Sequence, residues 1–275
     1  MTDEASEPQP TGGKSALTGP RFRPEGRAPT VFGHRGLSAR APENTLAAFR
    51  LISTEGIPGV ELDIHQCRSG ELVVAHDDTL SRTAGVDLTL REATLEQIRT
   101  HDVGSWFNPA FAAERIPTLE EVFELLGESV YYDIEIKPYG TFWGRAAPGG
   151  PEYTLRTLIR QHKLERRCLV SSFDPLVLRR FSELSREIPI ALIYSNSRKL
   201  PVTIRRGRGR LFCKPDVLKP HHSIVTPRYV RRHHARGRQV IPWTVDDPSV
   251  AAELYEAGVD GVISNIPDKI MAELR

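Results

Sequence analysis

The stretch Val60-Glu61-Leu62-Asp63-Ile64-His65 decides the fold, because its aliphatic run predicts a β-strand that ends among polar side chains. Three further aliphatic runs end in the same way, at Gly33-His34-Arg35-Gly36, at His76-Asp77 and at Glu135-Ile136-Lys137. Taken together, the four pieces predict that histidines, carboxylates, an arginine and a lysine collect where strands stop.

From Thr30 onward, strand-like and helix-like stretches alternate, which is typical of a parallel sheet. Eight such units in about 245 residues match the usual size of an α/β barrel of the (β/α)8, or TIM barrel, type. The expected strands are 30–34, 60–65, 130–136, 168–172, 189–194, 216–219, 239–245 and 261–264. The expected helices are 43–55, 118–126, 152–162, 175–186, 227–236, 248–257 and 268–274.

One unit departs from this alternation. A Ser-Gly turn within Arg68–Glu71 predicts a hairpin whose returning strand, Leu72–Ala75, brings His76 back toward the mouth of the barrel. The stretch from about 77 to 117 is too long for a simple loop, so we expect a small insertion after the second strand. A second insertion covers Tyr139–Pro151. The basic run Arg205–Arg210 is a third irregular piece, either a solvated loop or a contact for phosphate or a lipid headgroup.

Composition excludes several classes of protein. The chain has 275 residues and a net charge of +2, which is too small to indicate nucleic-acid binding. Its three cysteines are widely spaced, as expected for reduced thiols in the cytoplasm. No apolar run is long enough to cross a membrane. Residues 1–28 are polar and read as a disordered tail, so the barrel should occupy 29–275.

Three carboxylates are the candidate metal ligands. Side chains two positions apart on a strand share a face, so Glu61 and Asp63 point the same way. Glu135 ends the neighbouring strand. Together they form an oxygen-rich cup that suits Mg²⁺ or Ca²⁺ better than Zn²⁺. A Glu-x-Asp pair alone is more typical of a solvated strand face than of a metal site.

The cationic and histidine side chains point to phosphodiester chemistry. His34 and His76 can accept and donate protons near neutral pH, and cleavage of a phosphodiester requires both a base and an acid. Arg35 and Lys137 could bind a phosphate, although either could instead form a structural ion pair. Trp243 is expected to be a core residue or a wall against the substrate.

The segment Pro42-Glu43-Asn44-Thr45 is expected to open the first helix, because proline and acidic or amide side chains suit the first helical turn.

These motifs, in this order, resemble the glycerophosphodiester phosphodiesterase family over roughly residues 30–270. The resemblance rests on His34-Arg35-Gly36, Pro42-Glu43-Asn44-Thr45, Ala48-Phe49, Glu61-x-Asp63, His76-Asp77, Arg82-Thr83, Ile116–Glu121, Glu135-Ile136-Lys137, Ser171-Ser172-Phe173, Trp243-Thr244-Val245 and Gly258–Val262.

The resemblance implies a TIM barrel and a phosphoric diester hydrolase of lipid and glycerol metabolism. It implies that the three carboxylates hold one divalent cation, that His34 and His76 are the acid and base, and that Arg35 and Lys137 bind the phosphate. The glycerophosphodiester would give glycerol 3-phosphate and an alcohol through a cyclic phosphate. The expected partner is the small-molecule glycerophosphodiester, with no nucleic acid and no stable membrane insertion, and the oligomeric state is left open.

The chain departs from the family pattern at two places, and two alternative functions are compatible with the same residues. Ser264-Asn265 stands where the family commonly has Thr-Asp, and this change is expected to affect less important contacts than the metal cup. His65 is either a neighbour of the metal or a packing residue. The same site could serve a lysophospholipase D-type enzyme acting on acylated lipids, with the aromatic residues of 139–151 against the acyl chain. A non-catalytic barrel that senses a phosphorylated metabolite is a further alternative.

Overall fold

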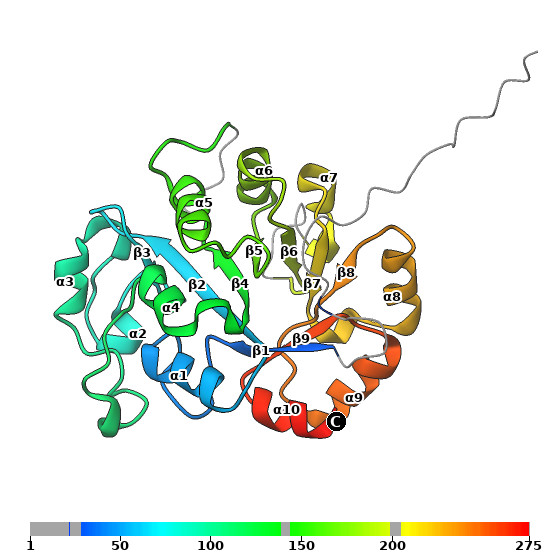
Figure 1. Ribbon diagram of the computed structural model, residues 1–275, viewed down its shortest axis with the longest axis horizontal. Coiled ribbons are helices and arrows are strands. Elements are labelled where there is room, and N and C mark those ends of the chain that lie inside the picture. The colour runs from blue at the N-terminus through cyan, green and yellow to red at the C-terminus, as the bar shows by residue number, and fades with distance from the viewer. Residues whose placement is uncertain (1–21, 23–28, 139–143, 199–204, 275) are drawn as a thin grey trace, which may run out of the picture.

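The computed structural model describes residues 22, 29–138, 144–198 and 205–274, and within them parallel strands form a barrel surrounded by helices (Figure 1). Neighbouring strands follow the order β8-β7-β6-β5-β4-β2-β1-β9, and β3 pairs antiparallel with β2 as a hairpin. The expected TIM barrel is therefore confirmed. The strands are β1 (Thr30–His34), β2 (Gly59–Gln66), β3 (Leu72–Val74), β4 (Tyr131–Ile136), β5 (Cys168–Ser172), β6 (Ile190–Tyr194), β7 (Val217–Pro220), β8 (Gln239–Val240) and β9 (Gly261–Ser264).

Backbone hydrogen bonds join the last two strands of the barrel. The N–H of Asp260 donates to the carbonyl of Val240 over 2.9 Å, and the N–H of Ile263 donates to that of Pro242 over 3.1 Å. The ladder assigned to β8 is only two residues long, shorter than the expected 239–245, because Pro242 has no N–H to donate. Even so, Trp243 still bridges to His221 beyond this proline.

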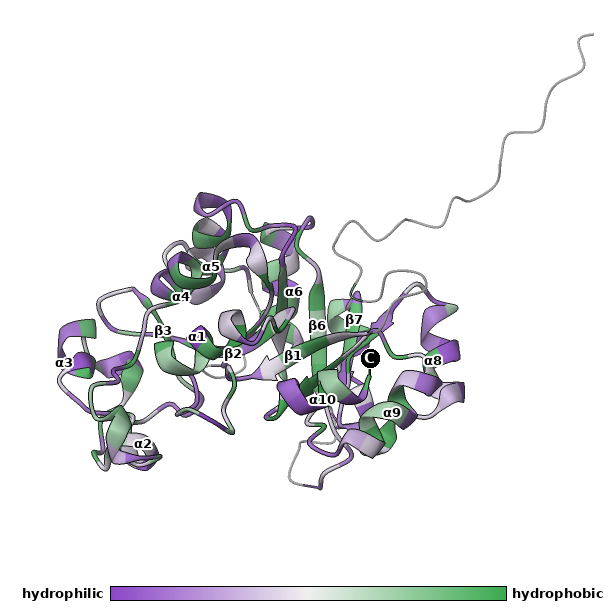
Figure 2. Ribbon diagram, turned by 60° about the horizontal axis from the view of Figure 1, so that its bottom comes forward, coloured by the Kyte–Doolittle hydropathy of each residue, from purple (hydrophilic) through white to green (hydrophobic). Residues whose placement is uncertain are grey.

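Helices lie on the outside of the barrel, and Figure 2 shows them hydrophobic toward the strands and hydrophilic away from them. Among the described residues, no helix combines the length and apolar character needed to cross a membrane. The helices are α1 (Leu46–Thr54), α2 (Ser81–Ala84), α3 (Leu95–Arg99), α4 (Leu119–Leu126), α5 (Pro151–Gln161), α6 (Pro175–Leu184), α7 (Arg210–Cys213), α8 (Pro227–His234), α9 (Pro248–Ala257) and α10 (Pro267–Glu273).

Alternation along β2 separates the core from the site. Val60, Leu62 and Ile64 belong to the apolar cluster between the strands and the helices. Glu61 and Asp63 point to the other face, into the barrel, where both are buried. The strand β2 therefore contributes carboxylates to the mouth of the barrel without removing apolar groups from the outer core.

The floor of the barrel is apolar. Phe32, two residues before His34, packs with Leu169, Val217 and other residues of the inward faces. Phe22 is the one described residue of the segment expected to be a disordered tail, and its ring is fully buried against Phe32. The rest of that segment lies outside the described residues. The apolar floor closes the barrel below the polar mouth.

The first helix begins later than expected. Thr45 is its N-cap and accepts a hydrogen bond from the N–H of Ala48, so α1 starts at Leu46. Asn44 has a left-handed φ of 57°, which a residue inside a helix does not adopt. The expectation that 42–45 form the first helical turn was wrong. These residues instead form a turn that faces the site.

The region between β6 and β7 also differs from the expectation, which placed no helix there. Arg205–Gly207 forms a 3-10 turn, and α7 follows it. Glycines at 207 and 209 and the left-handed Arg206 break the chain into short helical pieces, which is why no helical periodicity was visible in the sequence.

The insertion expected after the second strand is present. It contains α2, α3 and two 3-10 turns, Leu90–Glu92 and Pro109–Phe111. In Figure 1, α2 and α3 lie to one side of the barrel, beyond β3. A separate apolar cluster that includes Val73, Leu90 and Ile98 holds them together.

Candidate active site

A cavity of about 230 Å³ opens at the carboxyl ends of the strands. All eight residues proposed from the sequence line it, namely His34, Arg35, Glu61, Asp63, His76, Glu135, Lys137 and Trp243. The structure adds Phe173, Ile193, Lys219 and Ile263. The carboxyl end of a barrel is where the loops of such folds place catalytic groups.

The three carboxylates meet because β2 and β4 are neighbours in register, with Asp63 opposite Glu135. Oxygens of Glu61, Asp63 and Glu135 lie within 4.8 Å of one another, and all three residues are buried. The Nζ atom of Lys137 lies 2.7 Å from Asp63 Oδ1 and 2.7 Å from Glu135 Oε1. Burial alone would lower the pKa of Lys137, but these two charges outweigh it and raise the pKa.

The carboxylates differ in how far neighbouring positive charges balance their negative charge. Burial would raise the pKa of Asp63, but Lys137 and Arg35 hold it well below its usual range. Burial and the charge of Asp63 raise the pKa of Glu61 well above its usual range, and a backbone N–H of Arg35 is its donor at 3.2 Å. The ionised form of Glu61 is therefore poorly balanced by neighbouring positive charge, and a bound cation would stabilise it.

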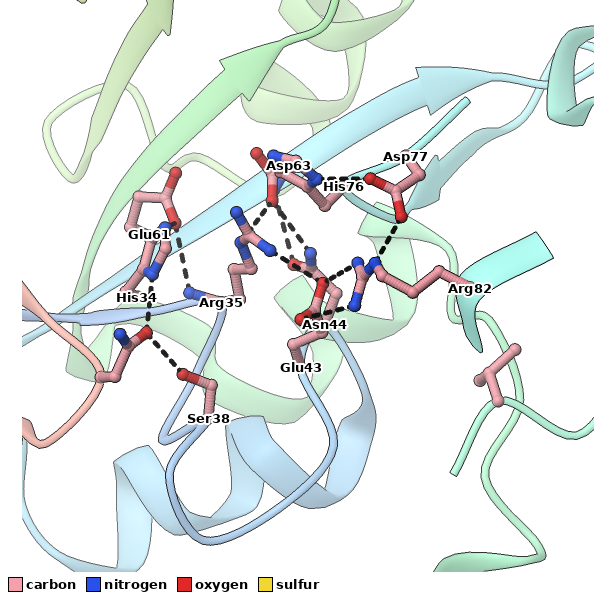
Figure 3. Close-up of polar contacts among 12 residues, drawn as sticks. His34, Arg35, Ser38, Glu43, Asn44, Glu61, Asp63, His76, Asp77 and Arg82 are labelled. Carbon is pink, nitrogen blue, oxygen red and sulfur yellow. Dashed lines mark hydrogen bonds and ion pairs between the residues drawn. The ribbon is translucent and has the colours of Figure 1, made fainter. Parts of the chain in front are cut away.

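Arg35 follows β1 in a left-handed conformation with φ 57°, which turns its side chain across the mouth of the cavity. Its Nη1 donates to Glu43 Oε1 over 2.9 Å, and its Nε lies 3.4 Å from Asp63 Oδ2. Asn44 Nδ2 donates to the same Asp63 oxygen over 3.0 Å. Glu43 and Asn44, expected from the sequence to open a helix, thus orient two site residues (Figure 3).

His34 is held by an amide. Its Nδ1 lies 2.7 Å from Asn265 Oδ1, and Asn265 Nδ2 donates to Asp246 Oδ2 over 2.7 Å. The Asp246 contact fixes which way the amide faces, so His34 Nδ1 is the donor and its Nε2 carries the lone pair. Burial and the charge of Arg35 lower the pKa of His34 to about 4. Asn265 therefore contacts the site directly, contrary to the expectation that its contacts were less important.

His76 is held by a carboxylate. Its Nδ1 lies 2.7 Å from Asp77 Oδ1, and Asp77 Oδ2 accepts from Arg82 Nε over 2.7 Å. Behind it, His65 is buried, and its Nε2 lies 3.3 Å from the carbonyl oxygen of His76. This contact agrees with a packing role for His65. The two catalytic candidates thus share a ring type but differ in the partner of Nδ1 (Figure 3).

A buried lysine was not anticipated. Lys219 Nζ lies 2.7 Å from Asp133 Oδ2 and 3.0 Å from Ser171 Oγ, beneath the carboxylate cup. Asp133 precedes Glu135 by two residues and shares its face, a signal that strand periodicity could have revealed. Burial would lower the pKa of Lys219, but Asp133 and Glu61 outweigh it and raise the pKa.

Aromatic side chains form one part of the cavity lining. Trp243 packs edge-to-face against Phe173 with 5.7 Å between ring centroids, and against His221 at 5.5 Å. Its Nε1 donates to the carbonyl of Lys219 over 2.9 Å. Phe142 and Trp143 are two of the aromatic residues of 139–151 that were expected against an acyl chain, and both lie outside the described residues.

Known proteins share this sequence and architecture. A family model described as the glycerophosphoryl diester phosphodiesterase family matches residues 34–269. A glycerophosphodiester phosphodiesterase of Caldanaerobacter subterraneus subsp. tengcongensis is 35% identical over 246 residues, which cover 89% of this chain and 97% of that relative. Human glycerophosphodiester phosphodiesterase 1 is 30% identical, over 79% of this chain and 72% of its own.

A solved structure is similar as well. It is a phosphodiesterase of Oleispira antarctica in complex with the product sn-glycerol-3-phosphate, with a TM-score of 0.74 and 30% identity. The similarity covers 90% of this chain and 96% of that one.

Proposed function

Since the chain belongs to the glycerophosphoryl diester phosphodiesterase family and is therefore a phosphoric diester hydrolase, we propose that it hydrolyses glycerophosphodiesters to glycerol 3-phosphate and an alcohol. The observation that carries the proposal is the cavity in which carboxylates, histidines, Arg35 and Lys137 converge. The similar Oleispira antarctica enzyme, solved with sn-glycerol-3-phosphate, supports the substrate class.

The cup fits one divalent cation. Three buried carboxylates offer hard oxygen donors within 4.8 Å, a set suited to Mg²⁺ or Ca²⁺. The raised pKa of Glu61 reflects negative charge that a cation would offset. When bound, the cation supplies Lewis-acid polarisation of a phosphoryl oxygen. Glu61, Asp63 and Glu135 would hold it.

Arg35 and Lys137 would bind the phosphate from the edge of the cup. Both line the cavity, and both are already oriented by carboxylates, Arg35 by Glu43 and Lys137 by Asp63 and Glu135. This prior orientation reduces the ordering needed when an anionic substrate arrives. The guanidinium offers paired donors, and the ammonium offers a compact charge.

His34 is suited to be the base of the first step. Its pKa of about 4 leaves it neutral at pH 7, with Nδ1 donating to Asn265 and Nε2 able to accept a proton. His76 has Nδ1 engaged by Asp77, and its Nε2 would donate a proton to the leaving alkoxide. A neighbouring glycerol hydroxyl would attack phosphorus, and water would then open the cyclic phosphate.

The substrate test is hydrolysis of glycerophosphocholine and glycerophosphoethanolamine with Mg²⁺ or Ca²⁺, followed by phosphorus NMR. We expect glycerol 3-phosphate from at least one of them. His34→Ala should abolish this activity and leave the circular dichroism spectrum unchanged, whereas His101→Ala in the insertion should retain activity. Failure of the folded, metal-supplied wild type to release glycerol 3-phosphate from any glycerophosphodiester would refute the proposal.

The metal test is independent of turnover. A cation that binds only the folded state raises the melting temperature. We expect Mg²⁺ or Ca²⁺ to raise the melting temperature of the wild type and of Glu120→Gln, an exposed change on α4. Glu61→Gln should lose most of that shift. An equal shift in Glu61→Gln would place the cation elsewhere.

A second candidate is the same reaction on acylated lipids. Leu211 and Phe212 in α7 are 77% and 43% exposed, next to Arg208 and Arg210. Apolar side chains beside arginines suit the surface of an anionic membrane. Activity on lysophosphatidylcholine without activity on glycerophosphocholine would favour this candidate.

A further inference from the structure

The insertion reaches the active site through one arginine. Arg82 belongs to α2, whose Ala84 packs against the apolar cluster of the insertion. Its guanidinium nevertheless lies against Glu43 and Asp77, next to Arg35 and His76, as Figure 3 shows. Trp106, also of the insertion, lies against it with 5.6 Å between the guanidinium carbon and the ring centroid. The contact with Trp106 restricts where the guanidinium can point.

Arg82 binds two carboxylates at once. Its Nη2 lies 2.6 Å from Glu43 Oε1 and its Nη1 lies 3.1 Å from Glu43 Oε2, a bidentate pair. Its Nε donates to Asp77 Oδ2 over 2.7 Å. The planar fork of a guanidinium can make these three bonds together, whereas the single ammonium of a lysine cannot.

Each of the two carboxylates held by Arg82 also contacts a different site residue. Glu43 Oε1 also accepts from Arg35 Nη1 over 2.9 Å, and Asp77 Oδ1 lies 2.7 Å from His76 Nδ1. One guanidinium therefore sets the position of the phosphate-binding arginine and of a catalytic histidine. Arg35 follows β1 and His76 follows β3, so no local backbone constraint aligns them with each other.

The charges support a fixed geometry. Burial would raise the pKa of Glu43, but the hydrogen bonds from Arg82 and the charge of Arg35 lower it. Burial would likewise raise the pKa of Asp77, but His76 and Arg82 lower it. The side chain of Glu43 is only 14% exposed, so its pair with Arg82 is partly shielded from water. Partly buried charge pairs hold their geometry better than solvated ones.

We propose that Arg82 is a positioning residue that aligns His76, through Asp77, with Arg35, through Glu43, and so couples the insertion to catalysis. The proposal rests on the proposed function of the site. It assigns the insertion a role in the reaction, because only the folded insertion holds Arg82 at this point.

The first experiment measures kcat and KM for glycerophosphodiester hydrolysis in Arg82→Gln and Arg82→Lys. Misplacement of reacting groups by about 1 Å costs about 100-fold. We expect Arg82→Gln to lower kcat/KM by about 10- to 100-fold through both a lower kcat and a higher KM. Arg82→Lys keeps the charge but should stay at least about tenfold below the wild type, since the ammonium cannot span both carboxylates.

Single variants should distinguish the effect of Arg82 through Asp77 from its effect through Glu43. Asp77→Asn acts on His76 and should mainly lower kcat, whereas Glu43→Gln acts on Arg35 and should mainly raise KM. Combined with Arg82→Gln, each should cost less than the product of the separate effects, because the pairs share contacts. Arg99→Gln is the matched control. Arg99 lies in the same insertion and pairs with Glu121 on α4, away from the cavity.

A readout independent of turnover distinguishes this proposal from the proposed function. Calorimetric binding of sn-glycerol 3-phosphate should be weaker in Arg82→Gln and Glu43→Gln than in the wild type and Arg99→Gln. If the wild type hydrolyses nothing, the proposed function fails, and this comparison still tests the coupling. Wild-type kinetics and binding in folded Arg82→Lys, or equal losses in Arg82→Gln and Arg99→Gln, would overturn the role of Arg82.

Discussion

At the residue scale, the neighbours of a side chain decide its chemistry more than its type does. His34 donates to the neutral amide of Asn265, whereas His76 faces the carboxylate of Asp77. Burial and Arg35 then lower the pKa of His34 to about 4. These different partners are consistent with the roles that we propose, His34 as the base and His76 as the acid.

Asn265→Asp should counteract the lowering of the pKa of His34. A carboxylate at Nδ1 favours the protonated ring, so the pKa of His34 should rise from about 4. A base works only when deprotonated, so the acid limb of the pH profile of kcat/KM should move to higher pH. Profiles recorded at saturating Mg²⁺ test this, with Asn108→Asp in the insertion as the control. An unmoved acid limb would remove Asn265 from the mechanism.

At the element scale, β4 and β7 are linked through the inside of the barrel. Lys219 from β7 and Asp133 from β4 form a buried ion pair, and neither side chain is more than 2% exposed. The two strands are not neighbours in the sheet, so this contact crosses the interior. A buried charge that loses its partner is strongly destabilising, even where the intact pair adds little.

Lys219→Met should therefore lower the free energy of unfolding by about 3–5 kcal/mol, because it leaves Asp133 buried and unpaired. Lys219→Met combined with Asp133→Asn should recover most of that loss, since Asp133, the direct partner of Lys219, is then no longer a buried unpaired charge. Urea unfolding of the two variants and the wild type gives the comparison. If the double variant is no more stable than Lys219→Met, the cost lies in packing and not in charge.

At the scale of the whole molecule, buried histidines link stability to pH. Burial lowers the pKa of His34, His65 and His233 from 6.5 to about 4 in the folded protein. The unfolded chain therefore binds protons more readily in this range. Stability from this source is fully present above pH 6.5 and is lost as the pH falls toward 4.

We expect the free energy of unfolding to decrease between pH 6.5 and 4, by up to about 3 kcal/mol for each such histidine. His233→Gln should reduce this dependence, since His233 lies in α8, away from the cavity. Urea unfolding at several pH values, with His101→Gln in the insertion as the control, measures the slope. A slope unchanged by His233→Gln would contradict the assignment.

The sequence by itself determined the barrel and the set of groups at its mouth. Strand periodicity is local, so the alternation in β2 alone places Glu61 and Asp63 on the face opposite Val60 and Leu62. The order of strands and helices then predicts a parallel barrel, and its carboxyl ends gather all eight predicted residues in one cavity.

Only the tertiary structure decided how those groups are held. His34 meets Asn265 across 231 residues of sequence, and Lys219 meets Ser171 across 48. From its sequence context, Glu43 was expected to open a helix. In the structure its carboxylate instead binds Arg82 of the insertion. Such contacts depend on barrel closure and on the docking of the insertion. No periodicity encodes them, because each joins elements whose separation is set by packing and not by the chain between them.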